Sequence, residues 1–354
     1  MDSTRVLASA SRVSSTRHHV LGLRAIHTYW DRSLPANLTI EPGDTVTFTT
    51  REPSQGGVAR DLKMVGEVGG DPELVALVAS TDTAPMATGL GTELGGHALA
   101  GPVAVTGAVP GDGLIVEVVS VEPSFWGWTA CGPGDETPFG EELAEWMLHI
   151  WDLRDGEYAI FRRGIRVPIS PFCGVMGVAP AELGQHRTAP PRNVGGNLDI
   201  RQLIAGSILT LPVEVDGALF SVGDVHAAQG DGEVAGTAIE TDAKVTLRFD
   251  LIKGGAPDSP AFTAPALGRT RGPWFSSTGS DSDPRRAVRQ ALQGVITFLQ
   301  DHHRLSFQEA IILASACVDL RLSQVVNAGQ WTISACLPLD IFDLSDDVAS
   351  SCST

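Results

Sequence analysis

The sequence predicts an α+β fold that is predominantly β, in which β-sandwich or barrel layers are followed by a C-terminal α/β part. Short runs of alternating apolar and polar residues recur along most of the chain, which is typical of half-buried strands. The 354 residues include 39 glycines and 22 prolines. Together they make up about 17% of the chain, above the roughly 12% of average usage, and they are spread between the runs. Strong helix-start signals occur only near the C-terminal end.

The first strands are predicted by two similar segments. Residues 37–50 are typical of two strands around a turn at residues 42–44, and Val46 and Phe48 alternate with threonines in the second strand. Residues 102–122 follow the same order of strand, turn and strand. Further strands are expected at residues 161–178, 207–215, 218–222, 234–241 and 244–253.

Helices are expected mainly at the end of the chain. Asp283 is a favourable N-cap residue with Pro284 at the first helical position, which predicts a long helix there. Ser306 and Glu309 have the spacing of a capping box and predict a second helix. Weaker patterns predict short helices at residues 72–78 and 141–147.

These elements suggest a division of the chain into four parts. The first part is rich in serine and arginine and is expected to be frayed, and the last carries the two strong helix signals. The expected parts are a frayed N-terminus (1–17), an N-terminal β-rich domain (18–160), a central β-rich domain with polar loops (161–260) and a C-terminal helical α/β part (261–354).

Charge excludes some classes of partner. The chain has 25 Lys and Arg against 42 Asp and Glu, which gives a net charge of −17. A chain this acidic repels phosphate backbones and anionic membrane surfaces, so we expect no nucleic-acid partner and no membrane partner. The five cysteines include no C-x-x-C pair, and neither a secretory signal nor a membrane span is evident. We therefore expect a soluble, cytoplasmic protein with reduced thiols.

Polar residues gather in residues 190–202. Gly195 and Gly196 permit unusual backbone torsions, and Asn197 and Asp199 follow two positions apart. In an extended or turning backbone these two side chains share a face and converge on one ion or ligand. Alternatively, Asp199 caps a short helix from residue 200 to 205.

A second polar segment, residues 221–233, lies between two apolar strands. It carries Asp224, His226, Gln229, Asp231 and Glu233 among three glycines. A polar loop held between rigid strands is a common place for binding and catalytic groups, and histidine with carboxylates is a typical ligand set of a catalytic zinc ion. The alternative is a surface turn, because aspartate and glycine are common turn residues.

Other candidate residues are less distinctive. His97 lies at a glycine-rich strand entrance, where a structural role and a ligand role are both open. His27 and Trp30 follow a strand and either line a pocket or pack in the core. Motifs of serine hydrolases, zinc proteases and nucleotide-binding loops are absent, and Cys173 has no adjacent base that would make it a nucleophile.

Two long stretches resemble the acetamidase/formamidase family of amide hydrolases. They are GGNLDIRQLIAGSILTLPV, which begins at Gly195, and GALFSVGDVHAAQGDGEVAGTAIE, which begins at Gly217. Supporting stretches are IHTYWDRSLPANLTIEPGDTV, HALAGPVAVTGAVPGD, PFCGVMGVAP and the C-terminal LASACVDLRLSQVVN with ACLPLDIF, so that the resemblance extends from about His27 to Phe342.

The resemblance implies hydrolysis of a short carboxamide of the formamide or acetamide class to a carboxylate and ammonia. It also implies a β-rich homo-oligomer with a bound divalent metal, expected to be Zn²⁺, which activates the attacking water. Hydrolysis of small cyclic amides, and non-catalytic binding of a small ligand or ion, are the alternative functions.

On this basis we expect three groups of site residues. Glu233 is the expected general base and then acid, and Asp224 is expected to orient His226. The expected metal ligands are Asp199, His226 and His97. Substrate-binding side chains are expected from Asn197, Gln229, His27 and Trp30.

Overall fold

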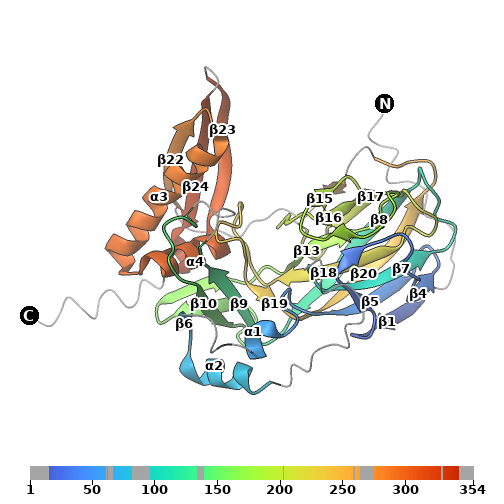
Figure 1. Cartoon of the computed structure of the whole chain (residues 1–354), viewed down its shortest axis with the longest axis horizontal. Coiled ribbons are helices and arrows are strands. Elements are labelled where there is room, and N and C mark those ends of the chain that lie inside the picture. Colours follow the sequence, from blue (N-terminus) through green and yellow to red (C-terminus); the bar gives the residue numbers. More distant parts are fainter. Residues whose placement is uncertain are drawn as a thin grey trace, which may run out of the picture.

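The computed structural model describes residues 16–60, 62, 67–81, 96–133, 139–201, 203–257, 260–263, 274–327 and 330–342. Three sheets form most of the molecule, and the C-terminal elements, orange to red in Figure 1, occupy one end of it. No described helix has the length and apolar character that crossing a membrane requires.

The first sheet has six strands, and neighbours in its order are often distant in sequence. Most of its pairs are antiparallel, and the parallel β1–β5 pair lies at one edge. In order, its strands are β1 (His18–Leu21), β5 (Thr45–Thr50), β20 (Ala243–Ile252), β8 (Gly113–Pro123), β17 (Ile208–Pro212) and β21 (Ala261–Thr263).

The second sheet has 13 strands and carries the polar segments found in the sequence. Its main path is β12 (Ile165–Pro168), β11 (Tyr158–Arg162), β10 (Met147–Asp152), β9 (Trp126–Cys131), β19 (Glu240–Thr241), β18 (Phe220–His226), β13 (Phe172–Gly177), β16 (Gly195–Asn197) and β15 (Pro191–Arg192). Beside this path lie β2 (Ile26–His27), β4 (Leu38–Ile40), β6 (Glu67–Gly69) and β7 (Leu99–Val105). A two-stranded pair joins β3 (Tyr29–Trp30) to β14 (His186–Arg187).

The two large sheets pack face to face around one apolar core. The predicted alternation in β5 is confirmed, because Val46 and Phe48 are fully buried while the threonines between them are partly exposed. Phe48 and Phe249 of the first sheet lie 6.2 Å and 5.0 Å from the ring of Phe220 in the second. Fully burying one such ring stabilises the fold by roughly 1.5–3 kcal/mol. Among the described residues neither sheet closes into a barrel, so the layered arrangement is that of a sandwich.

The C-terminal part adds two helices and a third sheet. Its elements are β22 (Trp274–Asp281), α3 (Pro284–His303), α4 (Phe307–Cys317), β23 (Asp319–Asn327), β24 (Gln330–Pro338) and a 3-10 turn (Leu339–Ile341). Both helices begin where the sequence predicts them, with Asp283 as one N-cap and the Ser306–Glu309 capping box at the other. The helices bury their apolar side chains together with residues of β9 to β12, which ties this part to the second sheet.

The weaker helix predictions had mixed outcomes. The pattern at residues 72–78 is confirmed by α2 (Pro72–Ala79), which Asp71 caps, and a four-residue helix α1 (Gly57–Arg60) precedes it. The helix predicted at residues 141–147 is wrong: residues 139–146 form turns and coil, and β10 begins at Met147. Pairing of β10 with β9 and β6 outweighs the local helical pattern there.

The expected division at residue 160 stays a prediction. Strands from both sides of it pair within each large sheet, as β8 with β20 and β9 with β19 show. Residues 1–15 of the segment expected to be frayed lie outside the described residues.

Candidate active site

The polar segments of the sequence meet at one end of the central strands of the second sheet. β18 ends with Asp224 and His226, and the register pairs His226 with Phe172 of β13 and with Glu240 of β19. Asp199 follows β16, which also pairs with β13. Because β16, β13, β18 and β19 are neighbours, residues spread over more than forty sequence positions converge here.

The acidic cluster, which we define as Asp199, Asp224, Glu233 and Glu240, surrounds the imidazole of His226. Nε2 of His226 lies 3.2 Å from Glu240 Oε2, 3.5 Å from Asp224 Oδ2 and 4.0 Å from Glu233 Oε1. Two triads place single ligand atoms within 4.8 Å of one another: Asp199, His226 and Glu233, and Asp224, His226 and Glu240. Histidine and carboxylate side chains at these distances could hold a metal ion.

Unusual backbone conformations hold three of these side chains. Asp199, Asp224 and Glu233 have φ angles of 48°, 54° and 40°, in the left-handed region that residues other than glycine rarely adopt. Such conformations cost roughly 1–3 kcal/mol each and persist only where surrounding contacts impose them. At Asp199 the contact is visible, because the amides of Leu198 and Asp199 both donate to the carbonyl of Gly174. The alternative of a helix from residue 200 to 205 is wrong: the residues described in this range, 200, 201 and 203–205, form turns and coil.

Gly174 lets two strands bring their carboxylates together. A Cβ atom at this position would lie 2.7 Å from Oδ1 of Asp199 and 2.7 Å from Oδ2 of Asp224. It would also lie 2.9 Å from Cε1 of His226. Real Cβ atoms do not approach other atoms so closely, so the cluster requires glycine at the centre of its floor.

Gln229 fixes the tautomer of His226. Oε1 of Gln229 lies 2.8 Å from Nδ1 of the imidazole, and the Gln229 amide nitrogen donates to the backbone carbonyl of Asp199. The second bond orients the glutamine so that its oxygen faces the ring, which makes Nδ1 the protonated nitrogen. In the neutral ring, Nε2 then turns its lone pair toward the acidic cluster, as a metal-binding histidine does.

The electrostatics of the site favour positive charge. Burial, together with the neighbouring carboxylates, raises the pKa of Glu240 to about 7 and that of Asp199 to about 6, against the opposing effect of His226. Burial and the same neighbours raise the pKa of Glu233 well above its ordinary value. Burial alone would lower the pKa of His226, but Glu240 and Asp224 raise it well above the usual value. Asp224, despite burial, has a lowered pKa because His97 and His226 lie beside it.

The C-terminal part holds the loop that carries Glu233. The amide of Gly230 donates to the carbonyl of Ser315 in α4, and the amide of Asp231 donates to the carboxylate of Asp319. A Cβ atom at Gly230 would lie 2.0 Å from the carbonyl oxygen of Val318. The loop therefore rests directly on the junction of α4 and β23, and its position depends on residues almost 90 positions later.

Most of the residues proposed from the sequence come together here. Asp199, Asp224, His226, Gln229 and Glu233 lie in or against the cluster. His97 is at its edge, with Nε2 3.7 Å from Asp224 Oδ2 and Nδ1 3.0 Å from the hydroxyl of Thr188. The ligand and catalytic roles assigned to these residues stay predictions.

The expected substrate-binding residues differ in what they offer a ligand. Trp30 Nε1 and Asn197 Oδ1 are buried and have no hydrogen-bond partner among the described residues. Trp30 packs with Leu99, which pairs with Gly223 next to Asp224, and with Val175, which follows Gly174. Both ring nitrogens of His27 have partners, Tyr29 O and Ser221 Oγ, so His27 holds the segment that carries Trp30.

Glu240 is the cluster residue that sequence reasoning missed. It follows the apolar pair Ala238 and Ile239 at the start of a strand, and its side chain is only 3% exposed. A carboxylate at a position that the pattern makes buried was the available signal. Cys173, for which the sequence offers no adjacent base, is fully buried, and burial raises its pKa to about 12, so it remains a thiol.

The residues present fit a bound divalent cation. Asp199 Oδ1, His226 Nε2 and Glu240 Oε2 are buried and have no hydrogen-bond partner among the described residues. Nε2 of His226 and Oε2 of Glu240 are close but are not aligned for a hydrogen bond. Buried polar atoms are costly without partners, and a cation beside Nε2 of His226, in either triad, would reduce that cost.

The fold is a β-rich scaffold with a buried cluster of carboxylates around one imidazole, and sequence comparison specifies the class of protein. The profile of the acetamidase/formamidase family matches residues 92–186 and 181–344. The chain therefore belongs to the acetamidase/formamidase family and is an amidase.

Curated relatives cover most of the chain. An acetamidase of Mycolicibacterium smegmatis is 26% identical over 383 residues, which cover 86% of this chain and 88% of that protein. A formamidase of Methylophilus methylotrophus is 24% identical and covers 90% of this chain and 89% of its own length. Among solved structures, a gamma lactamase from Delftia acidovorans has a TM-score of 0.77 and 25% identity, covering 92% of this chain and 93% of its own.

Proposed function

We propose that the chain hydrolyses a short carboxamide of the formamide or acetamide class to a carboxylate and ammonia at the acidic cluster. The observation that carries this proposal is the set of three buried polar atoms in the cluster, on Asp199, His226 and Glu240, that have no hydrogen-bond partner among the described residues. The names of the curated relatives support the substrate class.

A divalent ion, proposed to be zinc, fits the cluster. Asp199, Asp224, His226 and Glu240 would hold it, with His97 beside Asp224 at the edge. When bound, such an ion supplies Lewis acidity, which acidifies water and polarises a carbonyl group. Imidazole with carboxylates suits zinc among the common divalent ions.

Glu233 is the proposed proton carrier. Its side chain is 20% exposed, more than those of Asp224, His226 and Glu240, and it lies on a loop at the open side of the cluster. Its raised pKa suits a group that accepts a proton and later donates it. The carboxylate takes a proton from the attacking water as the C–O bond forms. It then gives that proton to the amide nitrogen as the C–N bond breaks, which releases ammonia.

Asn197 and Trp30 are proposed to orient the amide. They offer a buried acceptor and a buried N–H donor, which match the NH₂ and C=O groups of a primary carboxamide. His27 acts as a positioning residue through its bonds to Tyr29 O and Ser221 Oγ. A formamide or acetamide has few atoms to contact, so we expect a high KM.

Ammonia release from formamide and acetamide tests the reaction. We expect release that falls after dialysis against a chelator and returns when zinc is added. Glu233→Gln should reduce kcat by about 10²-fold or more with little change in metal content. Asp231→Asn, on the same loop but facing Arg201, is the matched control and should retain activity. No release from any small amide, or full activity in Glu233→Gln, would refute the proposal.

Metal content tests the ligand assignment separately from activity. Elemental analysis of the purified chain should find about one divalent ion per chain, and Asp199→Asn and Glu240→Gln should each reduce occupancy by about tenfold or more. His97→Gln should reduce it less, because His97 lies at the edge of the cluster. Full occupancy in both carboxylate variants would show that these residues are not ligands.

Hydrolysis of a small cyclic amide is the second candidate. The similarity to the gamma lactamase structure, with a TM-score of 0.77, favours it. The same bond is broken, and the released amine stays attached to the product. Adding a γ-lactam to the substrate panel, with product detection by an amine-reactive dye, distinguishes the two candidates.

A homo-oligomeric assembly is also proposed, on the basis of the family resemblance. Size-exclusion chromatography with light scattering measures the molar mass in solution. A mass of 37.2 kDa, that of one chain, would refute this proposal.

A further inference from the structure

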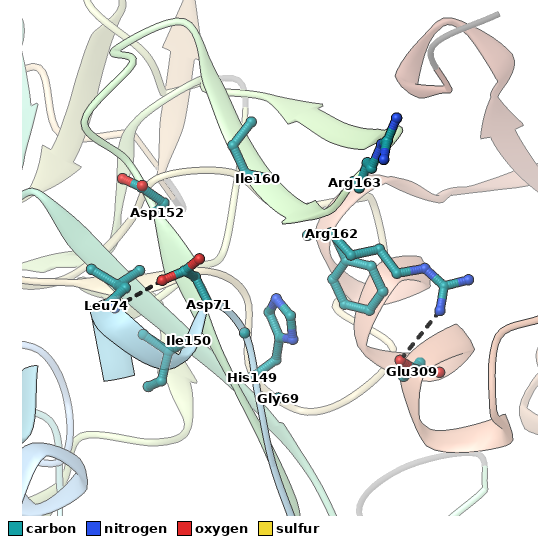
Figure 2. A pocket seen from close by; sticks show the side chains of 12 residues that line it. Gly69, Asp71, Leu74, His149, Ile150, Asp152, Ile160, Arg162, Arg163 and Glu309 are labelled. Atoms are coloured by element: carbon teal, nitrogen blue, oxygen red, sulfur yellow. Dashed lines mark hydrogen bonds and ion pairs between the residues drawn. The ribbon is translucent and has the colours of Figure 1, made fainter. Parts of the chain in front are cut away.

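A cavity lies away from the acidic cluster. Its volume is about 420 Å³, and it shares no residue with the cluster. It opens where β10, β11, the start of α2 and the N-terminal turn of α4 meet (Figure 2). Volumes of about 300–1,000 Å³ are usual for small-molecule sites, so the space is adequate for a small ligand.

The two ends of this cavity carry opposite charges. Figure 2 shows Asp71 and Asp152 on one side and Arg162 and Arg163 on the other, with Ile160 between them. The strand register agrees, because Asp152 pairs with Ile160 and Arg162 follows two residues later. Two residues along a strand correspond to about 7 Å, so the charged ends are well separated.

Existing contacts at both ends leave room for exchange with a ligand. Nη1 of Arg162 lies 3.6 Å from Oε1 of Glu309, a long ion pair between side chains that are 37% and 26% exposed, and Nη2 of Arg162 donates to the carbonyl of His303. At the acidic end Asp152 accepts from Arg154, while Asp71 uses Oδ1 for the first amides of α2. Ion pairs this exposed contribute little to stability, so a better-placed ligand group can replace them.

A buried histidine forms the floor between the two ends. His149 is 3% exposed, and its Nε2 has no hydrogen-bond partner among the described residues. Figure 2 shows the imidazole rising between Asp71 and Arg162, and the Phe161 ring tilts against it at 4.3 Å. A Cβ atom at Gly69 would lie 2.8 Å from Nδ1, so bare backbone closes the other side of the ring. Burial lowers the pKa of His149 to about 3, against the smaller opposing effect of the backbone groups of Phe161 and Ile160, so the imidazole is a neutral polar group.

We propose that this cavity binds a linear amino acid whose ammonium and carboxylate groups are separated by several carbons. The ammonium group contacts the Asp71 and Asp152 end, and the carboxylate contacts Arg162 and Arg163. The carbon chain lies along Ile160, a hydrophobic side chain that is 39% exposed, and above His149. An α-amino acid is too short to reach both ends, and simple carboxylates or amines satisfy one end only.

A ligand series tests the proposal on the purified chain by calorimetric titration and thermal shift. The series is glycine, 4-aminobutyrate, 5-aminovalerate, butyrate and butylamine. We expect saturable binding of 4-aminobutyrate or 5-aminovalerate. The other three compounds should bind at least about tenfold more weakly, because each lacks one charge-assisted contact. Equal binding of butyrate, or no binding of either long amino acid, would overturn the proposal.

Three substitutions locate the binding within this cavity. Asp71→Asn removes one charge but keeps an N-cap side chain, and Ile160→Trp fills the space between the ends. We expect about tenfold weaker binding in the first and loss of binding in the second, whereas Asp155→Asn, in the neighbouring turn, should bind normally. Retained amide hydrolysis shows that each variant is folded. Unchanged binding in a folded Ile160→Trp variant would place the ligand elsewhere. None of these residues touches the acidic cluster, so failure here leaves the proposed amidase reaction unaffected.

Discussion

Stability should fall in mild acid because His27 is buried in its neutral form. The side chain is 4% exposed, and burial lowers its pKa from 6.5 to about 4, against a smaller opposing effect of the bond to Tyr29 O. Between these pH values the unfolded chain binds the proton and the folded chain does not, so protonation favours unfolding. The stabilisation is complete above pH 6.5 and is lost as the pH falls toward about 4.

The size of this effect follows from the two pKa values. One pKa unit corresponds to about 1.4 kcal/mol, so His27 alone should reduce the free energy of unfolding by about 2 kcal/mol between pH 7 and pH 5. His27→Gln removes the titration while keeping polar atoms near Tyr29 O and Ser221 Oγ. Urea unfolding, followed by tryptophan fluorescence at pH 7, 6 and 5, measures the difference between parent and variant.

The comparison of the parent chain with His27→Gln isolates the contribution of His27, because all other titrating groups are common to both. We expect the variant to lose about 2 kcal/mol less than the parent over this pH range. If the two stabilities decline in parallel between pH 7 and pH 5, the imidazole is not buried neutral in the folded chain.

Three further substitutions test close packing and buried charge. Gly174→Ala would place a methyl group 2.7 Å from two carboxylate oxygens of the cluster. It should reduce metal content and kcat by about tenfold or more. The control Gly22→Ala, whose methyl group would have no neighbour within 4 Å, should change neither. Gly230→Ala collides with Val318 O and should destabilise the chain by about 1–3 kcal/mol in urea unfolding and reduce activity, with Gly22→Ala again as the control. Glu52 is buried and accepts four hydrogen bonds. Glu52→Ala should reduce the free energy of unfolding by about 3 kcal/mol, and Glu52→Gln should reduce it clearly less. Equal losses in the two variants would contradict the hydrogen-bond explanation.

Local signals predicted the elements whose ends are fixed by neighbouring residues. The Asp283 N-cap and the Ser306–Glu309 capping box act over three residues or fewer, so both helices are recognisable in the sequence. The alternation in β5 is equally local. The helix predicted at residues 141–147 failed because β10 begins at Met147 and is stabilised by strands β9 and β6, whose pairing no local pattern reveals.

Residues of the candidate site were predictable where polar side chains interrupt apolar strands. Asp224, His226 and Glu233 stood out on that ground, and Asn197 and Asp199 stood out beside two glycines. Glu240 did not, because it belongs to an apolar run and becomes a cluster residue only through its pairing with His226. The floor at Gly174 was likewise invisible, because its importance lies in the atoms that a side chain there would displace.

The sequence by itself determined the β-rich class, the two C-terminal helices and the residue types that the site uses, because these follow from periodicity, capping and composition within short windows. Only the tertiary structure decided which of those residues meet. β16, β13, β18 and β19 become neighbours through long-range pairing, and the loop of Glu233 rests on α4 and β23. Side-chain proximity depends on the register and packing of segments far apart in the chain, and such contacts leave no periodic signal in either segment alone.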